Sequence, residues 1–165
     1  MARVLEVCTR HPVGGIVKIG PWGGEGGRDF DIPETAQPQR LEAITICSSL
    51  AVVDAISFAY RDENDEWQHV GPWGGWGGDP HVIRLEPEEV VTEISGTVGY
   101  IGVQPSDVMT SLTIVTNCRR HGPFGDAVEP DGTPFSVPVI NGGSIVALFG
   151  RAWDYIDAIG VYVRV

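Results

Sequence analysis

The residues best suited to acid–base chemistry are two carboxylates near the end of the chain. Asp154 and Asp157 lie three residues apart in WDYID (153–157), and paired carboxylates are the groups that hydrolyse glycosidic bonds. Nothing around them in the sequence indicates the raised pKa that a general acid needs. The histidines are scattered and no nucleophile motif accompanies them: His11, His69, His81 and His121. We therefore predict that the protein is not an enzyme.

The cysteines and the net charge exclude further classes. Cys8, Cys47 and Cys118 form an odd set without C-x-x-C spacing, so we expect no metal site and no cofactor. A net charge of −11, from 22 acidic and 11 basic residues, repels phosphate backbones and anionic surfaces. No apolar run approaches membrane-spanning length. We expect no nucleic-acid partner and no membrane insertion, whereas a neutral ligand is compatible with this charge.

The elements that position these residues repeat three times along the chain. GPWGG (20–24) recurs at 71–75 and, shortened to GPFG, at 122–125, with the first glycines 51 residues apart. A second element, out of phase with the first, begins with Asp54 and returns with Asp157. Its middle copy has Thr110 in place of the aspartate. Three units of about 50 residues therefore fill the chain from about residue 14 to its end.

The sequence of each unit predicts short β-strands separated by turns. Six segments alternate apolar with polar residues or are rich in β-branched side chains, whereas no stretch sustains a helical period. They are Leu41–Ser48, Ala55–Tyr60, His81–Leu85, Val91–Ser95, Ser111–Thr116 and Gly160–Val165. The GPWGG segments are interpreted as turns, and the aromatic residues Trp22, Trp73 and Phe124 as core or corner anchors. We predict an all-β fold of three four-stranded sheets packed about a common axis.

Five segments in this order resemble the jacalin-related lectins. They are GPWGGxGG, SGTxG (95–99), TSLTIVTN (110–117), GPFG followed by GTPFSVP (132–138), and GRAWDYIDAIGVYV (150–163). The resemblance covers about residues 14–165, and it implies a β-prism I of three Greek-key sheets with pseudo-three-fold symmetry. Residues 1–13 lie outside the repeat and are expected to be a tail or a linker, which leaves open a join to another domain.

The resemblance also implies a sugar site built from two segments. A glycine-rich loop supplies Gly26 and Gly27. A G-x-x-x-D loop before the last strand supplies Trp153, Asp154, Tyr155 and Asp157, with Trp153 where that motif has glycine. A carboxylate accepts hydrogen bonds from two vicinal hydroxyls, backbone N–H groups donate to the same oxygens, and an aromatic ring covers the C–H face of the sugar. Whether Trp153 closes this pocket or adds contact area stays open.

The repeat copies both halves of this site once more. Gly77 and Gly78 correspond to Gly26 and Gly27, and Asp54 corresponds to Asp157. Leu50 stands where the motif has glycine. We predict a possible second carbohydrate site here, and a purely structural third copy.

The resemblance implies a lectin that binds glycans containing mannose or glucose, without a metal ion and with a role in plant defence. Galactose-binding members are cut just before the glycine equivalent to Gly27, whereas this chain runs unbroken through Gly24–Gly27. The alternative is a protein-interaction or structural prism whose sugar sites have degenerated. Because single sites of this type bind weakly, we expect a homo-oligomer, a dimer or higher. With no signal peptide visible, we expect a cytoplasmic or nucleocytoplasmic location.

Overall fold

The computed structural model describes residues 15–126 and 132–165, so the predicted tail or linker at residues 1–13 lies outside the described residues. All regular secondary structure in the described part is β-strand. The strands are β1 (Ile16–Gly23), β2 (Arg28–Phe30), β3 (Pro38–Ser48), β4 (Val53–Asp62), β5 (Trp67–Gly74), β6 (Asp79–Arg84), β7 (Val91–Gly99), β8 (Val108–Thr116), β9 (Arg120–Gly125), β10 (Thr133–Pro138), β11 (Ser144–Ala152) and β12 (Ile156–Arg164).

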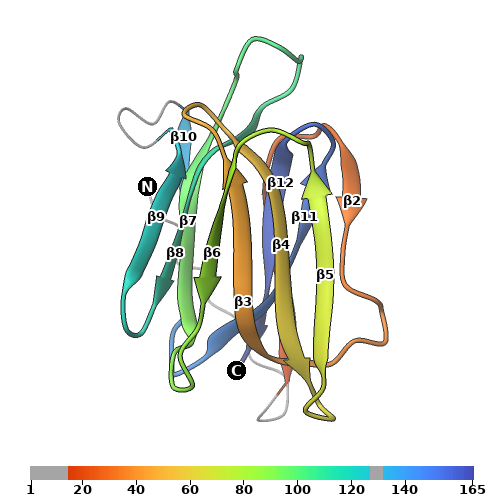
Figure 1. Cartoon of the computed structure of the whole chain (residues 1–165), viewed down its shortest axis with the longest axis vertical. Coiled ribbons are helices and arrows are strands. Elements are labelled where there is room, and N and C mark those ends of the chain that lie inside the picture. Colours follow the sequence, from red (N-terminus) through yellow and green to blue (C-terminus); the bar gives the residue numbers. More distant parts are fainter. Residues whose placement is uncertain (1–14, 127–131) are drawn as a thin grey trace.

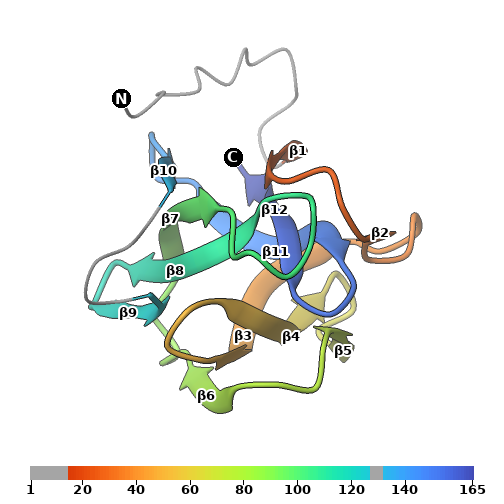
Figure 2. The same cartoon turned by 90° about the horizontal axis from the view of Figure 1, so that it is seen from above.

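The strands form three antiparallel sheets of four, which confirms the predicted fold class. The first sheet has the order β1-β12-β11-β2, the second β5-β4-β3-β6 and the third β9-β8-β7-β10. In the second and third sheets the fourth strand returns to lie beside the first, which is Greek-key order. The first sheet is assembled from both ends of the described chain. One bridge, between Val91 and Ile145, joins the first and third sheets. Figure 2 shows the three sheets as the sides of a prism.

One apolar core fills the space between the sheets. Ile44, Ile94, Leu112, Leu148 and Ile159 come from all three sheets, and each is at most 1% exposed. Burying a side chain of this size contributes about 1.5–3 kcal/mol. The three sheets therefore share a single hydrophobic interior and stabilise one another.

The sequence predicted that the GPWG and GPFG segments are turns, and this prediction was wrong. They are the C-terminal ends of β1, β5 and β9, and the loops begin with the residues that follow. The ladder is interrupted at each proline, where the register with the neighbouring strand shifts. All three Gly-Pro bonds, beginning at Gly20, Gly71 and Gly122, are cis. The sequence interpretation missed these strands because glycine and proline are rare in sheet interiors.

The aromatic residue after each of these prolines joins two sheets, which confirms its role as a corner anchor. Each ring lies against a ring on the fourth strand of a neighbouring sheet. The pairs are Trp22 with Phe135 at 6.2 Å between ring centroids, Trp73 with Phe30 at 4.4 Å, and Phe124 with His81 at 5.1 Å. The pseudo-three-fold symmetry of the sequence therefore extends to the contacts that fasten the corners of the prism.

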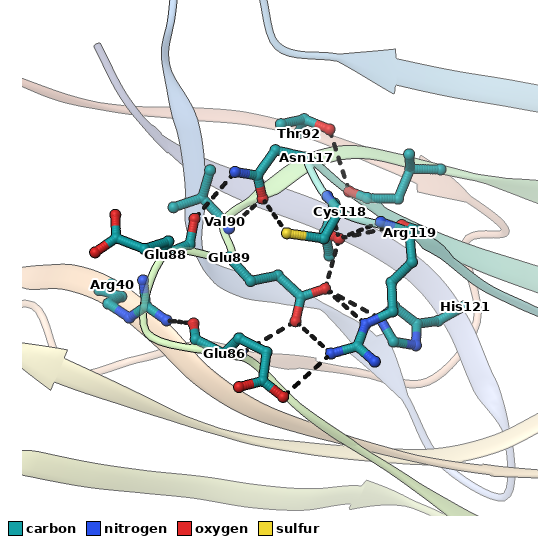
Figure 3. A network of polar contacts seen from close by, with 12 residues as sticks. Arg40, Glu86, Glu88, Glu89, Val90, Thr92, Asn117, Cys118, Arg119 and His121 are labelled. Carbon is teal, nitrogen blue, oxygen red and sulfur yellow. Dashed lines mark hydrogen bonds and ion pairs between the residues drawn. The ribbon is translucent and has the colours of Figure 1, made fainter.

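An ion pair between the buried Glu89 carboxylate and the exposed Arg119 side chain fastens the end of the prism that lies at the bottom of Figure 1 (Figure 3). The Glu89 carboxylate, in the β6–β7 turn, is fully buried. It accepts hydrogen bonds from Arg119 Nε at 3.0 Å and Arg119 Nη2 at 2.9 Å, and from Thr116 Oγ1 at 2.6 Å. The guanidinium holds the pKa of Glu89 far below its usual range. The network ties the β6–β7 turn to the β8–β9 turn.

We expect Glu89→Gln to lower the free energy of unfolding by about 1.5–3 kcal/mol, because it removes charge-assisted hydrogen bonds to a buried carboxylate. A lowered pKa in the folded state means that the stabilisation is complete above the unfolded pKa of about 4.3 and declines as the pH falls below it. Chemical denaturation at pH 7 and at pH 3 would measure both effects. The control is Glu88→Gln at the neighbouring exposed carboxylate. An equal loss of unfolding free energy in Glu89→Gln and Glu88→Gln at pH 7 would contradict a stabilising role for the Glu89–Arg119 pair.

Candidate functional site

The glycine-rich loops emerge together at the end of the prism that lies at the top of Figure 1. The β1–β2 loop contains Gly24–Gly27 and the β5–β6 loop contains Gly75–Gly78. The β3–β4, β7–β8 and β11–β12 loops lie at the same end (Figures 1 and 2). The predicted site residues are therefore on neighbouring loops, although they come from distant parts of the sequence.

The Asp157 side chain lies against the bare backbone of the first glycine loop. It is the second residue of β12 and is 1% exposed. A Cβ atom on Gly26 would lie 2.8 Å from Asp157 Oδ1, and one on Gly27 would lie 2.6 Å from Asp157 Oδ2. Gly27 also has a φ of 74°, which other residues rarely adopt. The structure therefore brings together Gly26, Gly27 and Asp157, as the sequence predicted.

The Asp157 carboxylate is only partly satisfied within the protein. Gln104, from the β7–β8 loop, donates from Nε2 to Asp157 Oδ1 at 3.0 Å. Asp157 Oδ2 is buried and has no hydrogen-bond partner among the described residues. Burial raises the pKa of Asp157, while the Gln104 bond, Arg151 and the Trp153 N–H oppose that rise. A buried acceptor without a partner is unusual in a folded protein and indicates a ligand or a strained site.

Arg151 fixes the glycine loop above this carboxylate. Its Nε donates to the Gly26 carbonyl at 2.9 Å, and its Nη2 donates to the Gly27 carbonyl at 2.9 Å. Its Nη1 also pairs with Asp29 Oδ1 at 2.7 Å. One side chain from β11 therefore holds the loop's two carbonyls away from the carboxylate, so that the pocket is formed before any ligand arrives.

The remaining predicted residues form the β11–β12 loop. The Trp153 N–H donates to the Tyr155 carbonyl at 3.0 Å, which makes a tight turn. The Trp153 ring is 55% exposed, and the Arg28 guanidinium lies 4.4 Å from its centroid. The Asp154 side chain is exposed and that of Tyr155 is half-buried. Asp154 and Asp157 therefore occupy opposite environments, one in solvent and one in a pocket.

The second copy has the same construction around Asp54, which is 4% exposed. Cβ atoms on Gly77 and Gly78 would lie 2.6 Å from Asp54 Oδ1 and Oδ2, respectively. Burial raises the pKa of Asp54, and hydrogen bonds from the Ser49 hydroxyl and N–H oppose that rise. Asp54 Oδ2, like Asp157 Oδ2, is buried without a partner in the described part of the chain. In the third copy, Thr110 is buried and its hydroxyl lies 2.7 Å from that of Thr97.

Sequence reasoning missed three side chains that complete the pockets: Gln104, Arg151 and Ser49. Gln104 lies in an irregular segment with no counterpart in the repeat, so no local signal identified it. Arg151 and Ser49 each lie a few residues before the aspartate and could have been considered for that reason. Within residues 15–126 and 132–165, no group of three or more His, Cys, Asp or Glu side chains could hold a metal ion. No helix in these ranges could cross a membrane.

Comparison with known proteins gives a consistent result. The family described as Jacalin-like lectin domain matches residues 19–162. Horcolin from Hordeum vulgare is 46% identical over 149 residues, which cover 89% of this chain and 96% of horcolin. The mannose/glucose-specific lectin of Parkia pendula is 38% identical over 158 residues, 92% of this chain and 33% of that protein.

Solved structures are similar over nearly the same range. A mannose binding jacalin related lectin from Ananas comosus superposes with a TM-score of 0.81 at 41% identity, covering 90% of this chain and 96% of its own. An artocarpin–mannotriose complex superposes with a TM-score of 0.79 at 29% identity, covering 94% and 100% of the two chains. The range matched by the family, residues 19–162, spans the segments that carry Asp54 and Asp157.

We expect Gly27→Ala to destabilise the protein more than Gly102→Ala. Both glycines have positive φ, so both variants carry backbone strain of about 1 kcal/mol. A Cβ at Gly102 meets nothing within 4 Å, whereas one at Gly27 lies 2.8 Å from the Ala152 carbonyl carbon and 2.6 Å from Asp157 Oδ2. Thermal and urea unfolding would compare the two variants. Equal destabilisation would mean that the first glycine loop is not held against the carboxylate.

Proposed function

Since this chain belongs to the family of jacalin-like lectin domains, whose members are carbohydrate-binding proteins and not enzymes, we propose that it binds mannose- and glucose-type sugars at Asp157. The observation that carries the proposal is the buried, unpartnered Asp157 Oδ2 beside glycine backbone. A carboxylate that faces bare backbone accepts from one or two sugar hydroxyls, while nearby N–H groups donate to the same hydroxyls.

The proposed binding uses no metal ion. The acceptor is a side-chain carboxylate, the donors are main-chain N–H groups, and the hydroxyls of a neutral sugar provide the matching donors and acceptors. Asp154 and Tyr155 contribute their backbone, and the Trp153 ring contributes an apolar face. An unbroken loop through Gly24–Gly27, tied by Arg151 at Gly26 and Gly27, supports mannose or glucose rather than galactose.

We propose a second site of the same kind at Asp54, Gly77 and Gly78. It is supported by the second unpartnered carboxylate oxygen and by the equivalent approach of the two glycines. Two sites on one prism, and more in a homo-oligomer, would convert weak single contacts into avidity. A cytoplasmic or nucleocytoplasmic location is a further proposal, supported by the free thiols of Cys47 and Cys118.

Calorimetric titration with methyl α-mannoside, and with galactose as the control sugar, tests this function. We expect saturable binding of the mannoside at two sites per chain. Asp157→Asn and Asp54→Asn should each remove one site, because losing charge-assisted bonds costs about 1.5–3 kcal/mol apiece. The control Asp154→Asn should bind as the parent does, since only its backbone is used. No heat with either sugar would favour the alternative, an interaction or structural domain with degenerate sites.

Sugar affinity should fall as the solution is acidified. Burial raises the pKa of both Asp157 and Asp54, so protonation removes an acceptor at a pH above the usual aspartate value of about 3.9. Affinity should be constant near pH 7 and decline through this raised pKa. Titrations between pH 7 and pH 4 would measure it, with circular dichroism to confirm that the fold persists. Unchanged affinity down to pH 4 would exclude ionised carboxylates as the acceptors.

A further inference from the structure

Exposed apolar side chains gather around the two proposed pockets. Leu50, Trp76, Tyr100, Val103 and Trp153 are each more than half exposed, and all lie on loops of the end shown at the top of Figure 1. Scattered exposed apolar residues are ordinary, whereas several on one end of a protein indicate a binding surface. The net charge of −11 makes an anionic membrane surface an unsuitable partner for this end.

The two tryptophans lie on adjoining loops. Trp76 is the central residue of the second glycine loop, Gly74–Gly78, and its exposed fraction is 104%. The backbone of that loop packs directly against the loop of Trp153, because a Cβ on Gly75 would lie 2.0 Å from the Asp154 carbonyl oxygen. The loop of Trp153 therefore contacts the glycine loop of the Asp54 pocket, while its own Asp157 belongs to the other pocket.

The Trp153 ring is oriented before any ligand is bound. The Arg28 guanidinium lies 4.4 Å from its centroid, and the backbone N–H of Trp153 donates to the Tyr155 carbonyl, which fixes the turn that carries the ring. In the first glycine loop, Glu25 occupies the position that Trp76 has in the second. The second glycine loop therefore carries an exposed aromatic side chain where the first carries a carboxylate, and that aromatic loop adjoins the loop of Trp153.

We propose that Trp76 and Trp153 form a stacking surface for the additional rings of an extended neutral oligosaccharide whose terminal sugar is held at Asp54 or Asp157. This inference rests on the proposed function. Pyranose rings present C–H faces that pack on indole rings, while their hydroxyls stay hydrated at the rim. A monosaccharide at Asp157 contacts at most the Trp153 ring and leaves the Trp76 indole in water. The ligand class matched to this end is consequently an oligosaccharide rather than a monosaccharide.

The test compares methyl α-mannoside with an α-linked mannotriose by calorimetry. The parent protein should bind the mannotriose more tightly than the monosaccharide. Trp76→Ala should weaken mannotriose binding about three- to tenfold and leave methyl α-mannoside affinity unchanged. Trp76→Phe should restore the mannotriose affinity, because a ring is kept. The control is Trp67→Ala, because Trp67 lies at the opposite end of β5 and is 47% exposed. This variant should change neither the mannotriose affinity nor the methyl α-mannoside affinity.

The outcomes separate this inference from the function on which it rests. No binding of either sugar by the parent would overturn both. Binding of both sugars by the parent, with equal mannotriose affinity in Trp76→Ala, would overturn the stacking surface alone. A lower sedimentation coefficient of ligand-free Trp76→Ala than of the parent would also overturn it, since a second copy of the chain would then cover this ring.

Discussion

A single backbone hydrogen bond recurs at the same end of all three sheets and determines where the loops leave the prism. The N–H of the residue after the GPWG or GPFG strand donates to the carbonyl of the aspartate, or of its threonine equivalent, on the adjacent strand. The pairs are Gly24 with Asp157 at 2.8 Å, Gly75 with Asp54 at 2.9 Å and Asp126 with Thr110 at 2.8 Å. The contact requires glycine just before the donor, since a Cβ at Gly23, Gly74 or Gly125 would lie 2.3, 2.1 or 2.3 Å from the same carbonyl. Because the residue whose carbonyl is fixed also carries the carboxylate, one bond aligns both halves of each pocket.

The three copies keep this backbone bond but differ in what they bury beside it. Thr110 is neutral, and its hydroxyl is satisfied by Thr97. Asp54 and Asp157 instead keep a buried carboxylate with an unpartnered oxygen, and burial raises the pKa of both. Such a group costs free energy in the folded state, so a domain that used these positions only for packing would gain stability from threonine there. Retaining two costly carboxylates is what a binding protein needs, and it weighs against a purely structural prism.

The repeat made the architecture predictable, because a 51-residue period with apolar alternation leaves few ways to bury three sheets. The resemblance to jacalin-related lectins identified Asp157 with its glycines, and the repeat then identified Asp54 with its own. Strands β1, β5 and β9 were not predicted, because a Gly-Pro pair is locally unfavourable in a strand. In the folded protein, pairing with the neighbouring strand and aromatic stacking at the corner stabilise a strand there. Gln104 escaped for a different reason: its bond to Asp157 spans 53 residues, and nothing in its own segment repeats. Such contacts depend on how neighbouring loops pack, which no local pattern encodes.

The two pockets are equivalent in backbone but not in chemistry. Gln104 from the long β7–β8 loop already donates to Asp157 Oδ1, whereas at Asp54 it is Ser49, from the pocket's own β3–β4 loop, that opposes the rise in the pKa. In the proposed function, a sugar at Asp157 therefore meets an internal amide that already occupies one carboxylate oxygen, whereas a sugar at Asp54 does not. The β11–β12 loop belongs to the first pocket and touches the glycine loop of the second through Asp154 and Gly75. The backbone contact between Asp154 and Gly75 therefore makes the loops of the two pockets neighbours at one end of the prism.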